Sequence, residues 1–376
     1  MTKMRTGAAI SWLVGGVVWF VLLMLLAFLG PGAKITPKQT AKQFFTATQY
    51  QILYGHPEFD AQNPNPKFAL NPTQVSELKS WDLNDCVATD GTANQASPSA
   101  CFCENAPAVK AVFDNDWPVQ PWNTWSTLPL SLMGLLILVF LVFSNPLARA
   151  NLMTVTYFFA LCYAFMTIAL GPLSMMLHVG LRNWGGWFDS LSLYVWFGFV
   201  ACYGWFRFIL GRRGIAPDRC SIIAKVLFFV AWVGVIVITA LLTLPDHSAI
   251  GAELLYVILG AAALLGEFFL YLPRAANWIL RIPVLGAPLR WLQRLIGAPD
   301  ATGTRWTSDA TWEIGGKAWF TIGGGTFLVA LIIWVLSFTK MPLCAPHSIQ
   351  GHAIFHTLSA FAAGFLYKYY RHEGEA

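Results

Sequence analysis

Long apolar runs separated by shorter polar connections dominate the chain. Runs long enough to cross a bilayer occur at about 8–30, 125–143, 153–178, 189–211, 221–243, 250–272, 318–338 and 350–370. Each is close to the roughly 20 residues that a membrane-spanning helix needs. The pattern therefore predicts an all-α integral membrane protein: a core of seven transmembrane helices plus one extra N-terminal helix. No small-residue cleavage site follows the first run, so residues 1–30 are expected to be an uncleaved anchor.

The composition agrees with this class of protein. Hydrophobic residues make up 56% of the 376 positions and charged residues only 11%, whereas a soluble domain carries roughly 25% charged residues. The net charge of +5 is small for this length and does not favour nucleic-acid binding. The lipid bilayer is the partner that the composition predicts.

Lysine and arginine give the orientation. Sixteen of them lie at one set of helix ends, whereas the opposite short loops carry only Arg182 and Lys340. By the positive-inside rule both termini are cytoplasmic. The long, turn-rich segment 31–122 is then extracytoplasmic, with short helices, and is followed by the core at 123–371 and a cytoplasmic tail at 372–376.

The seven cysteines divide between membrane and outer side. Cys162, Cys202 and Cys220 fall within predicted spans or at their inner ends. Four others fall on the outer side and allow two disulfides in any of three connectivities: Cys86, Cys101, Cys103 and Cys344.

Polar residues converge at one depth. His352 and His356, four residues apart, begin the last span from the outer side, and a helix places them on one face. His178 and Ser174 share a face near the outer end of the third span, and Asp189 starts the next span. Ionisable residues at membrane depth are costly and mark functional sites.

Three histidines with a nearby carboxylate suit catalytic zinc, which commonly takes three protein ligands and a water. Asp189 would orient that water, act as general base, or hydrogen-bond a ligating imidazole. Ser174 would donate a hydrogen bond to a developing oxyanion. Each residue alone has an ordinary alternative, namely interfacial histidines, a serine bonded to its own backbone and an aspartate helix cap. Their combination on one side favours a metal site.

The spacing Ser174-x3-His178-x10-Asp189, followed by His352-x3-His356, resembles the signature of the CREST superfamily. This group includes alkaline ceramidases, adiponectin and progestin receptors, and post-GPI-attachment lipid-remodelling proteins. The segment PWNTWSTLPLSLMGL, from Pro121, resembles the NTxSN start of the first ceramidase core helix, and CENAP, from Cys103, resembles their Cys-Glu element. The resemblance covers about 101–371.

The resemblance implies that His178, His352 and His356 bind zinc, with Ser174 and Asp189 as polar partners of the zinc water. The implied reaction is hydrolysis of a ceramide-like lipid amide to a sphingoid base and a fatty acid. An alternative within the same superfamily is a lipid receptor or sensor that turns over slowly or not at all.

The resemblance also implies disulfides and bears on calcium. Cys103 and Cys344 match the two cysteines of the family's disulfide. If they form that disulfide, Cys86 and Cys101 remain to form the second. The calcium site of ceramidases is matched in part, because Gln120 occupies an acidic position of the family and Phe102 precedes Cys103. The remaining candidate calcium ligands are Glu104, Asn105, Asp114 and Asp116.

Other classes of membrane protein fit less well. A retinal pump needs a mid-membrane lysine in its last helix, whereas Lys368 lies at the inner end. A transporter usually has broken helices in paired halves, and no such symmetry is present. Glu267, near the inner end of its span, is interpreted as snorkelling or pairing with an arginine rather than serving a proton path.

Overall fold

The computed structural model describes residues 6–29, 121–143, 151–155, 157–180, 183–212, 217, 220–244, 252–279, 314–337 and 350–372. All regular structure in these segments is helical, which confirms the predicted all-α class. The predicted extracytoplasmic segment, apart from its last two residues, lies outside the described residues, as does nearly all of the tail. The helices are α1 (Thr6–Leu29), α6 (Pro121–Ser126), α7 (Leu128–Phe143), α8 (Leu152–Val155), α9 (Phe158–Gly180), α10 (Asn183–Arg212), α11 (Ile222–Leu242), α12 (Ala252–Ile279), α15 (Ile314–Leu336) and α16 (Gly351–Arg371).

Six helical segments in the described part of the chain are long and apolar enough to cross a membrane. They lie in α1, α6 with α7, α9, α10, α11 and α15, so the protein is a multi-pass membrane protein. α12 and α16 occupy the other two predicted spans. The apolar part of α12 is the shorter Leu254–Phe268. α16 carries buried histidines and tyrosines on its inward face, which lowers its hydropathy. The count of seven plus one spans stays a prediction.

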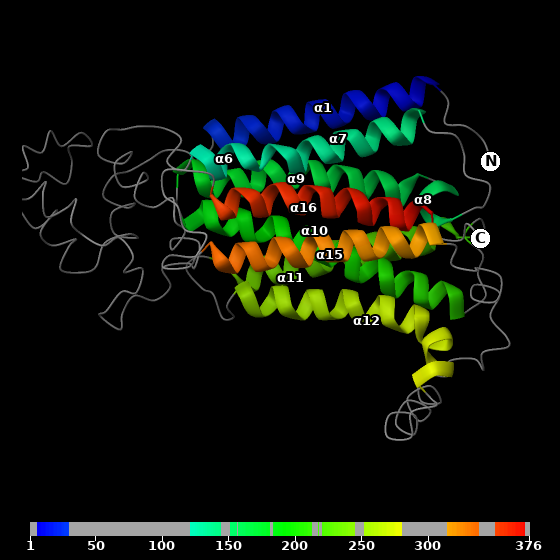
Figure 1. The fold of residues 1–376 in the computed structure, drawn as a ribbon. Coiled ribbons are helices and arrows are strands. Elements are labelled where there is room, and N and C mark those ends of the chain that lie inside the picture. The colour runs from blue at the N-terminus through cyan, green and yellow to red at the C-terminus, as the bar shows by residue number, and fades with distance from the viewer. Residues whose placement is uncertain are drawn as a thin grey trace, which may run out of the picture.

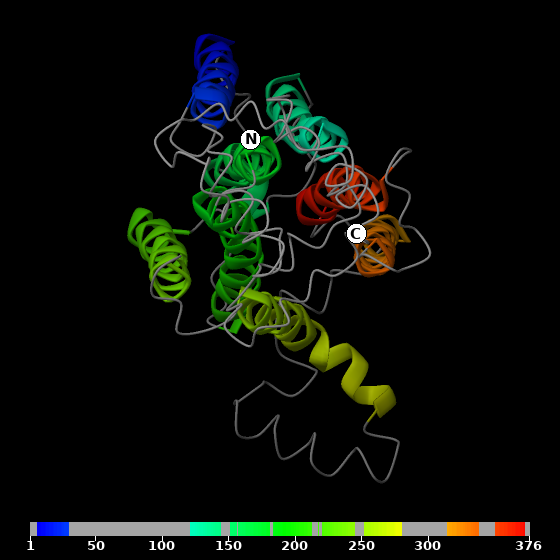
Figure 2. The same ribbon diagram turned by 90° about the vertical axis from the view of Figure 1, so that its left-hand side faces the viewer.

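The long helices lie side by side with their axes roughly aligned (Figure 1), and a view along them shows how they group (Figure 2). α9 packs against α1, α7 and α10, while α10 also packs against α11 and α12. α16 packs between α15 and α7. We call the two ends of the bundle the α6 end, where α6 meets the start of α16, and the α8 end, where Asn151 donates a hydrogen bond to the Arg371 carbonyl. The first residues of α1 and the last of α16 both lie at the α8 end (Figure 1).

Two glycines let α7 and α9 approach closely. A Cβ atom on Gly134 would overlap the backbone of Ile168, and one on Gly171 would overlap Ser131. Small residues at a crossing are the usual means by which membrane helices bring their backbones together. The close approach fixes α6 and α7 against the half of α9 that carries Ser174 and His178.

A proline in α9 is compensated by a serine of α7. Pro172 has no N–H, so the carbonyl of Ile168, four residues earlier, lacks its helical donor. The Ser131 hydroxyl donates to this carbonyl at 2.7 Å and is itself fully buried. The hydrogen bond therefore satisfies a carbonyl that water does not reach.

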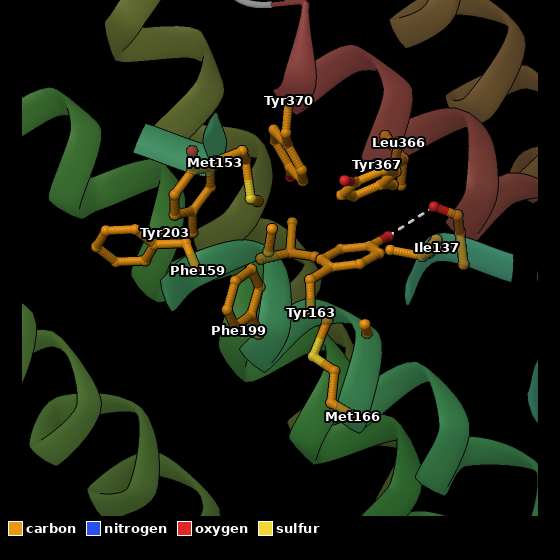
Figure 3. Packing of buried hydrophobic residues seen from close by; sticks show 14 of the residues in the cluster. Ile137, Met153, Phe159, Tyr163, Met166, Phe199, Tyr203, Leu366, Tyr367 and Tyr370 are labelled. Atoms are coloured by element: carbon orange, nitrogen blue, oxygen red, sulfur yellow. Dashed lines mark hydrogen bonds between the residues drawn. The ribbon is translucent and has the colours of Figure 1, made fainter. Parts of the chain in front are cut away.

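Aromatic side chains fill the core nearer the α8 end. The Tyr163 hydroxyl donates to the Ala363 carbonyl at 2.8 Å, the dashed line in Figure 3. Phe199 stacks on Tyr203 with ring centroids 5.6 Å apart, and Tyr370 meets Tyr203 edge to face at 5.0 Å. These contacts join α9, α10 and α16 in one packed layer (Figure 3).

A buried ion pair joins α10, α12 and α16. Arg207 pairs with Glu267, and both side chains are buried. The Tyr369 hydroxyl donates to the other Glu267 oxygen at 2.8 Å. The Arg207 guanidinium also lies 5.0 Å from the ring centroids of Tyr203 and Tyr370. Of the two interpretations offered for Glu267, pairing with an arginine is confirmed.

We predict that Ser131→Ala destabilises the protein by about 1–2 kcal/mol, because the Ile168 carbonyl is left without a donor. In a Pro172→Ala background residue 172 regains an N–H, so the same Ser131→Ala change should cost markedly less. Thermal or denaturant unfolding in mild detergent measures the four proteins of this cycle. An equal cost in both backgrounds would show that Ser131 does not compensate for the proline.

We predict that Glu267→Ala costs about 3–5 kcal/mol, because it leaves the Arg207 charge buried and uncompensated. Glu267→Gln, which keeps an acceptor for Tyr369, should cost less. Replacing both partners, as Arg207→Met with Glu267→Leu, should recover much of the loss. Unfolding of the purified variants in detergent gives these differences. A double variant as unstable as Glu267→Ala would contradict the explanation.

Candidate metal centre

α9 supplies one histidine and one serine to the α6 end of the bundle. Ser174 and His178 lie one turn apart in the last two turns of α9, and both side chains are buried. Their spacing of four residues places them on the same face, as the sequence predicts. The compensated proline lies just before them, so the end of α9 that carries them is held against α7.

α16 supplies the other two histidines from its first two turns. His352 and His356 are both buried, and their ring centroids lie 4.4 Å apart. Phe355 packs against both rings, and Trp334 of α15 packs on Phe355. Aromatic packing therefore surrounds the pair and shields it.

The three imidazoles meet at one point. The His178 ring centroid lies 5.0 Å from that of His352 and 5.2 Å from that of His356. One ligand nitrogen from each ring lies within 4.8 Å of the others. The predicted convergence of these side chains from two separate helices is confirmed. Among the described residues only these three histidines form such a set.

The separation of two of the three histidines matches that of two ligands on a tetrahedral metal ion. The Nε2 atoms of His178 and His352 lie 3.3 Å apart. Two imidazole nitrogens on a tetrahedral zinc ion, each about 2.0–2.1 Å from it, are about 3.3 Å apart. Three neutral nitrogen donors leave a fourth position for water or substrate, which is the arrangement of catalytic zinc sites. Imidazole also suits other transition metals, whereas calcium and magnesium prefer oxygen ligands.

Asp189 reaches the site through a close contact between α9 and α10. A Cβ atom on Gly185 would overlap the Met176 carbonyl, so a glycine is required where the first turns of α10 pass α9. Asp189, one turn later, is half-buried and lies beside the Ser174 side chain. It lies outside the three-histidine set, which leaves it free for the roles of base or water-orienting group.

Ser126 is part of the site and was missed by the sequence analysis. Its Oγ lies 2.9 Å from Nδ1 of His356 and also donates to the Asn123 carbonyl at 2.9 Å. Ser126 and His356 are 230 residues apart in the chain. The NTWST segment was identified only through its resemblance to the ceramidase NTxSN motif. No spacing rule links its serine to a particular histidine.

The arrangement differs from a serine-hydrolase triad. In such a triad a histidine lies between the serine and the carboxylate. Here Asp189 lies beside Ser174, and Nδ1 of His356 bonds to Ser126 rather than to a carboxylate. The 3.5 Å from Ser174 Oγ to His356 Nε2 is also long for a strong hydrogen bond. The residues are arranged as metal ligands with polar neighbours.

Several expected features fall outside the described residues. They are the calcium candidates Glu104, Asn105, Asp114 and Asp116 and the disulfides Cys103–Cys344 and Cys86–Cys101. Within the described part, Cys162, Cys202 and Cys220 are free thiols. The predicted pairings stay predictions.

Comparison with protein-family models, with curated proteins and with solved structures found no significant match. The fold and site define a multi-pass helical membrane protein with a buried three-histidine cluster that could hold a metal ion. The resemblance to the ceramidase-containing superfamily rests on the motifs quoted above.

We predict that the purified protein binds about one zinc ion and that His178→Ala or His356→Ala abolishes this binding. Each change removes one of three converging ligands. Elemental analysis after dialysis measures the zinc content. His372→Ala is the matched control because His372 follows the last residue of the same helix, about 24 Å along its axis from His356. A His356→Ala protein that folds and retains parental zinc would contradict the site.

Proposed function

We propose that this protein is a zinc-dependent intramembrane hydrolase of a lipid amide bond, similar to ceramidases, that converts a ceramide-like lipid to a sphingoid base and a fatty acid. The observation that carries the proposal is the convergence of three buried histidines close to Ser174, with Asp189 beside that serine. The quoted sequence motifs support the choice of substrate class.

The ligand set supports zinc as the metal. A zinc ion held by His178, His352 and His356 would supply Lewis acidity and would lower the pKa of a coordinated water to roughly 7. Burial of all three imidazoles keeps bulk water away from the substrate, which strengthens each electrostatic interaction in the site.

Asp189 is the general base in this proposal. Its carboxylate takes a proton from the attacking water as the water oxygen bonds to the amide carbonyl carbon. When the carbon–nitrogen bond breaks, the same carboxyl group returns the proton to the leaving amine. The products are the fatty acid and the free amine of the sphingoid base, so atoms and charge balance.

Ser174 changes partner during this cycle. Its hydroxyl has one proton, and in this proposal that proton bonds the Asp189 carboxylate while Asp189 is ionised. Once Asp189 has accepted the proton from water, the hydroxyl is released to donate to the oxyanion that develops on the substrate carbonyl. The Ser174–Asp189 hydrogen bond thus couples proton transfer to oxyanion stabilisation.

The position of the site suits a lipid amide. The three histidines lie in the last turns of α9 and the first turns of α16, at the α6 end of the bundle. The amide of a ceramide-like lipid lies just beneath the headgroups, at the corresponding depth of the bilayer. In this proposal the α6 end faces the extracytoplasmic side, as the lysine and arginine distribution predicts, and the substrate enters laterally from the membrane.

We predict that purified protein with zinc releases fatty acid from a labelled ceramide and that Asp189→Asn retains the metal while lowering turnover by about 10²–10⁴-fold. Release of labelled fatty acid and zinc content are measured on the same samples, with His356→Ala as the metal-free blank. Zinc-loaded protein that binds ceramide without cleaving it would support the receptor alternative. An Asp189→Asn variant with parental turnover would exclude the proposed base.

A further inference from the structure

The hydroxyl oxygen of Ser126, the last residue of α6, lies next to a ring nitrogen of His356. Ser126 Oγ lies 2.9 Å from Nδ1 of His356, on the side of the ring away from Nε2. Nε2 faces Ser174, 3.5 Å away, and so points into the site. The two ring nitrogens of His356 therefore have different surroundings.

Ser126 has a single hydroxyl proton, and its use determines which ring nitrogen of His356 carries a hydrogen. A serine hydroxyl has one proton, and the Asn123 carbonyl, 2.9 Å away, can only accept it. Because that proton is donated to the Asn123 carbonyl, Ser126 Oγ can only accept a hydrogen bond from His356. Both hydrogen bonds form together only if Nδ1 of His356 bears the hydrogen. The His356 ring also lies beside the backbone of Asn123, on the same short helix.

We infer that Ser126 is a positioning residue that holds His356 as the Nδ1–H tautomer and so keeps the Nε2 lone pair directed at the metal. This inference rests on the proposed metal site. A second hydrogen bond of this kind orients the ring and raises the basicity of the ligating nitrogen. Loss of such a partner typically lowers metal affinity by roughly 10–100-fold.

The packing of α6 explains why the serine is held there. α6 lies against both α9 and α16, and Asn123 and Thr124 are fully buried. Trp125 contacts Phe28 of α1 with ring centroids 5.8 Å apart. The hydroxyl is therefore fixed by a packed turn of chain and is not carried by a free loop.

The first test uses metal-free full-length protein labelled with ¹⁵N-histidine. The imidazole nitrogen signals show which nitrogen of His356 bears hydrogen, and the His356 signals are assigned by their loss in His356→Gln. We expect hydrogen on Nδ1 in the parental protein and a mixture of tautomers in Ser126→Ala. A parental His356 with hydrogen on Nε2 would overturn the inference, and this measurement on the parental chain requires no variant of Ser126.

The second test measures zinc affinity against a competing chelator. Ser126→Ala should weaken binding by about 10-fold, at the lower end of the expected range because the Asn123 carbonyl remains. Ser126→Thr keeps the hydroxyl and should retain parental affinity. Ser337→Ala is the matched control, since Ser337 is buried and donates to the carbonyl three residues earlier at 2.7 Å, as Ser126 does. An affinity within twofold of the parental value in Ser126→Ala, or an equal loss in Ser126→Thr, would overturn the inference.

The two tests separate this inference from the proposed function. If the parental protein binds no zinc, the proposed hydrolase fails, while the tautomer of His356 in the metal-free protein still decides the role of Ser126. If zinc binds and ceramide is not cleaved, the affinities of the Ser126 variants still decide it. Catalytic turnover is not needed for either result.

Discussion

A polar group that water does not reach inside a membrane protein must find its partner in the protein itself. In the described segments this constraint accounts for two hydrogen bonds between helices. Ser131 of α7 completes the α9 backbone at Pro172. Ser126 of α6 bonds His356 of α16. Each bond joins two helices and supplies a partner for a polar atom of a buried residue, Ile168 or His356.

The same constraint accounts for polar clusters at both ends of α16. At the α6 end the helix carries two histidines beside the histidine of α9, and at the α8 end Tyr369 bonds the carboxylate that pairs with Arg207. The turns between them pack through Ala360, Ala362 and Ala363. α16 is therefore apolar enough to pack in its middle and polar where it meets specific partners, which explains its low hydropathy.

The sequence predicted what depends on local pattern and missed what depends on which helices are neighbours. Apolar length located the helices, and the positions of His178, His352 and His356 near the ends of their helices predicted the three-histidine cluster. Ser126 could not be assigned to His356, because their contact depends on the packing of α6 against α16. Arg207 is one of the sixteen basic residues that the sequence analysis assigned to helix ends, whereas Glu267 and three tyrosines allow it to be fully buried. The position of Arg207 thus depends on Glu267, an acceptor 60 residues away in the chain.

The relative placement of the two histidine-bearing helices depends on the segment that lies between them. α6 and α7 contact both α9 and α16. Along this segment two serines five residues apart satisfy polar atoms on different helices: Ser126 bonds the His356 ring of α16, and Ser131 bonds the Ile168 carbonyl of α9. A shift of α16 along α9 would have to break one of these bonds or distort the helical segment that carries both serines. The 3.3 Å separation of the His178 and His352 nitrogens is thus determined by the packing of these helices.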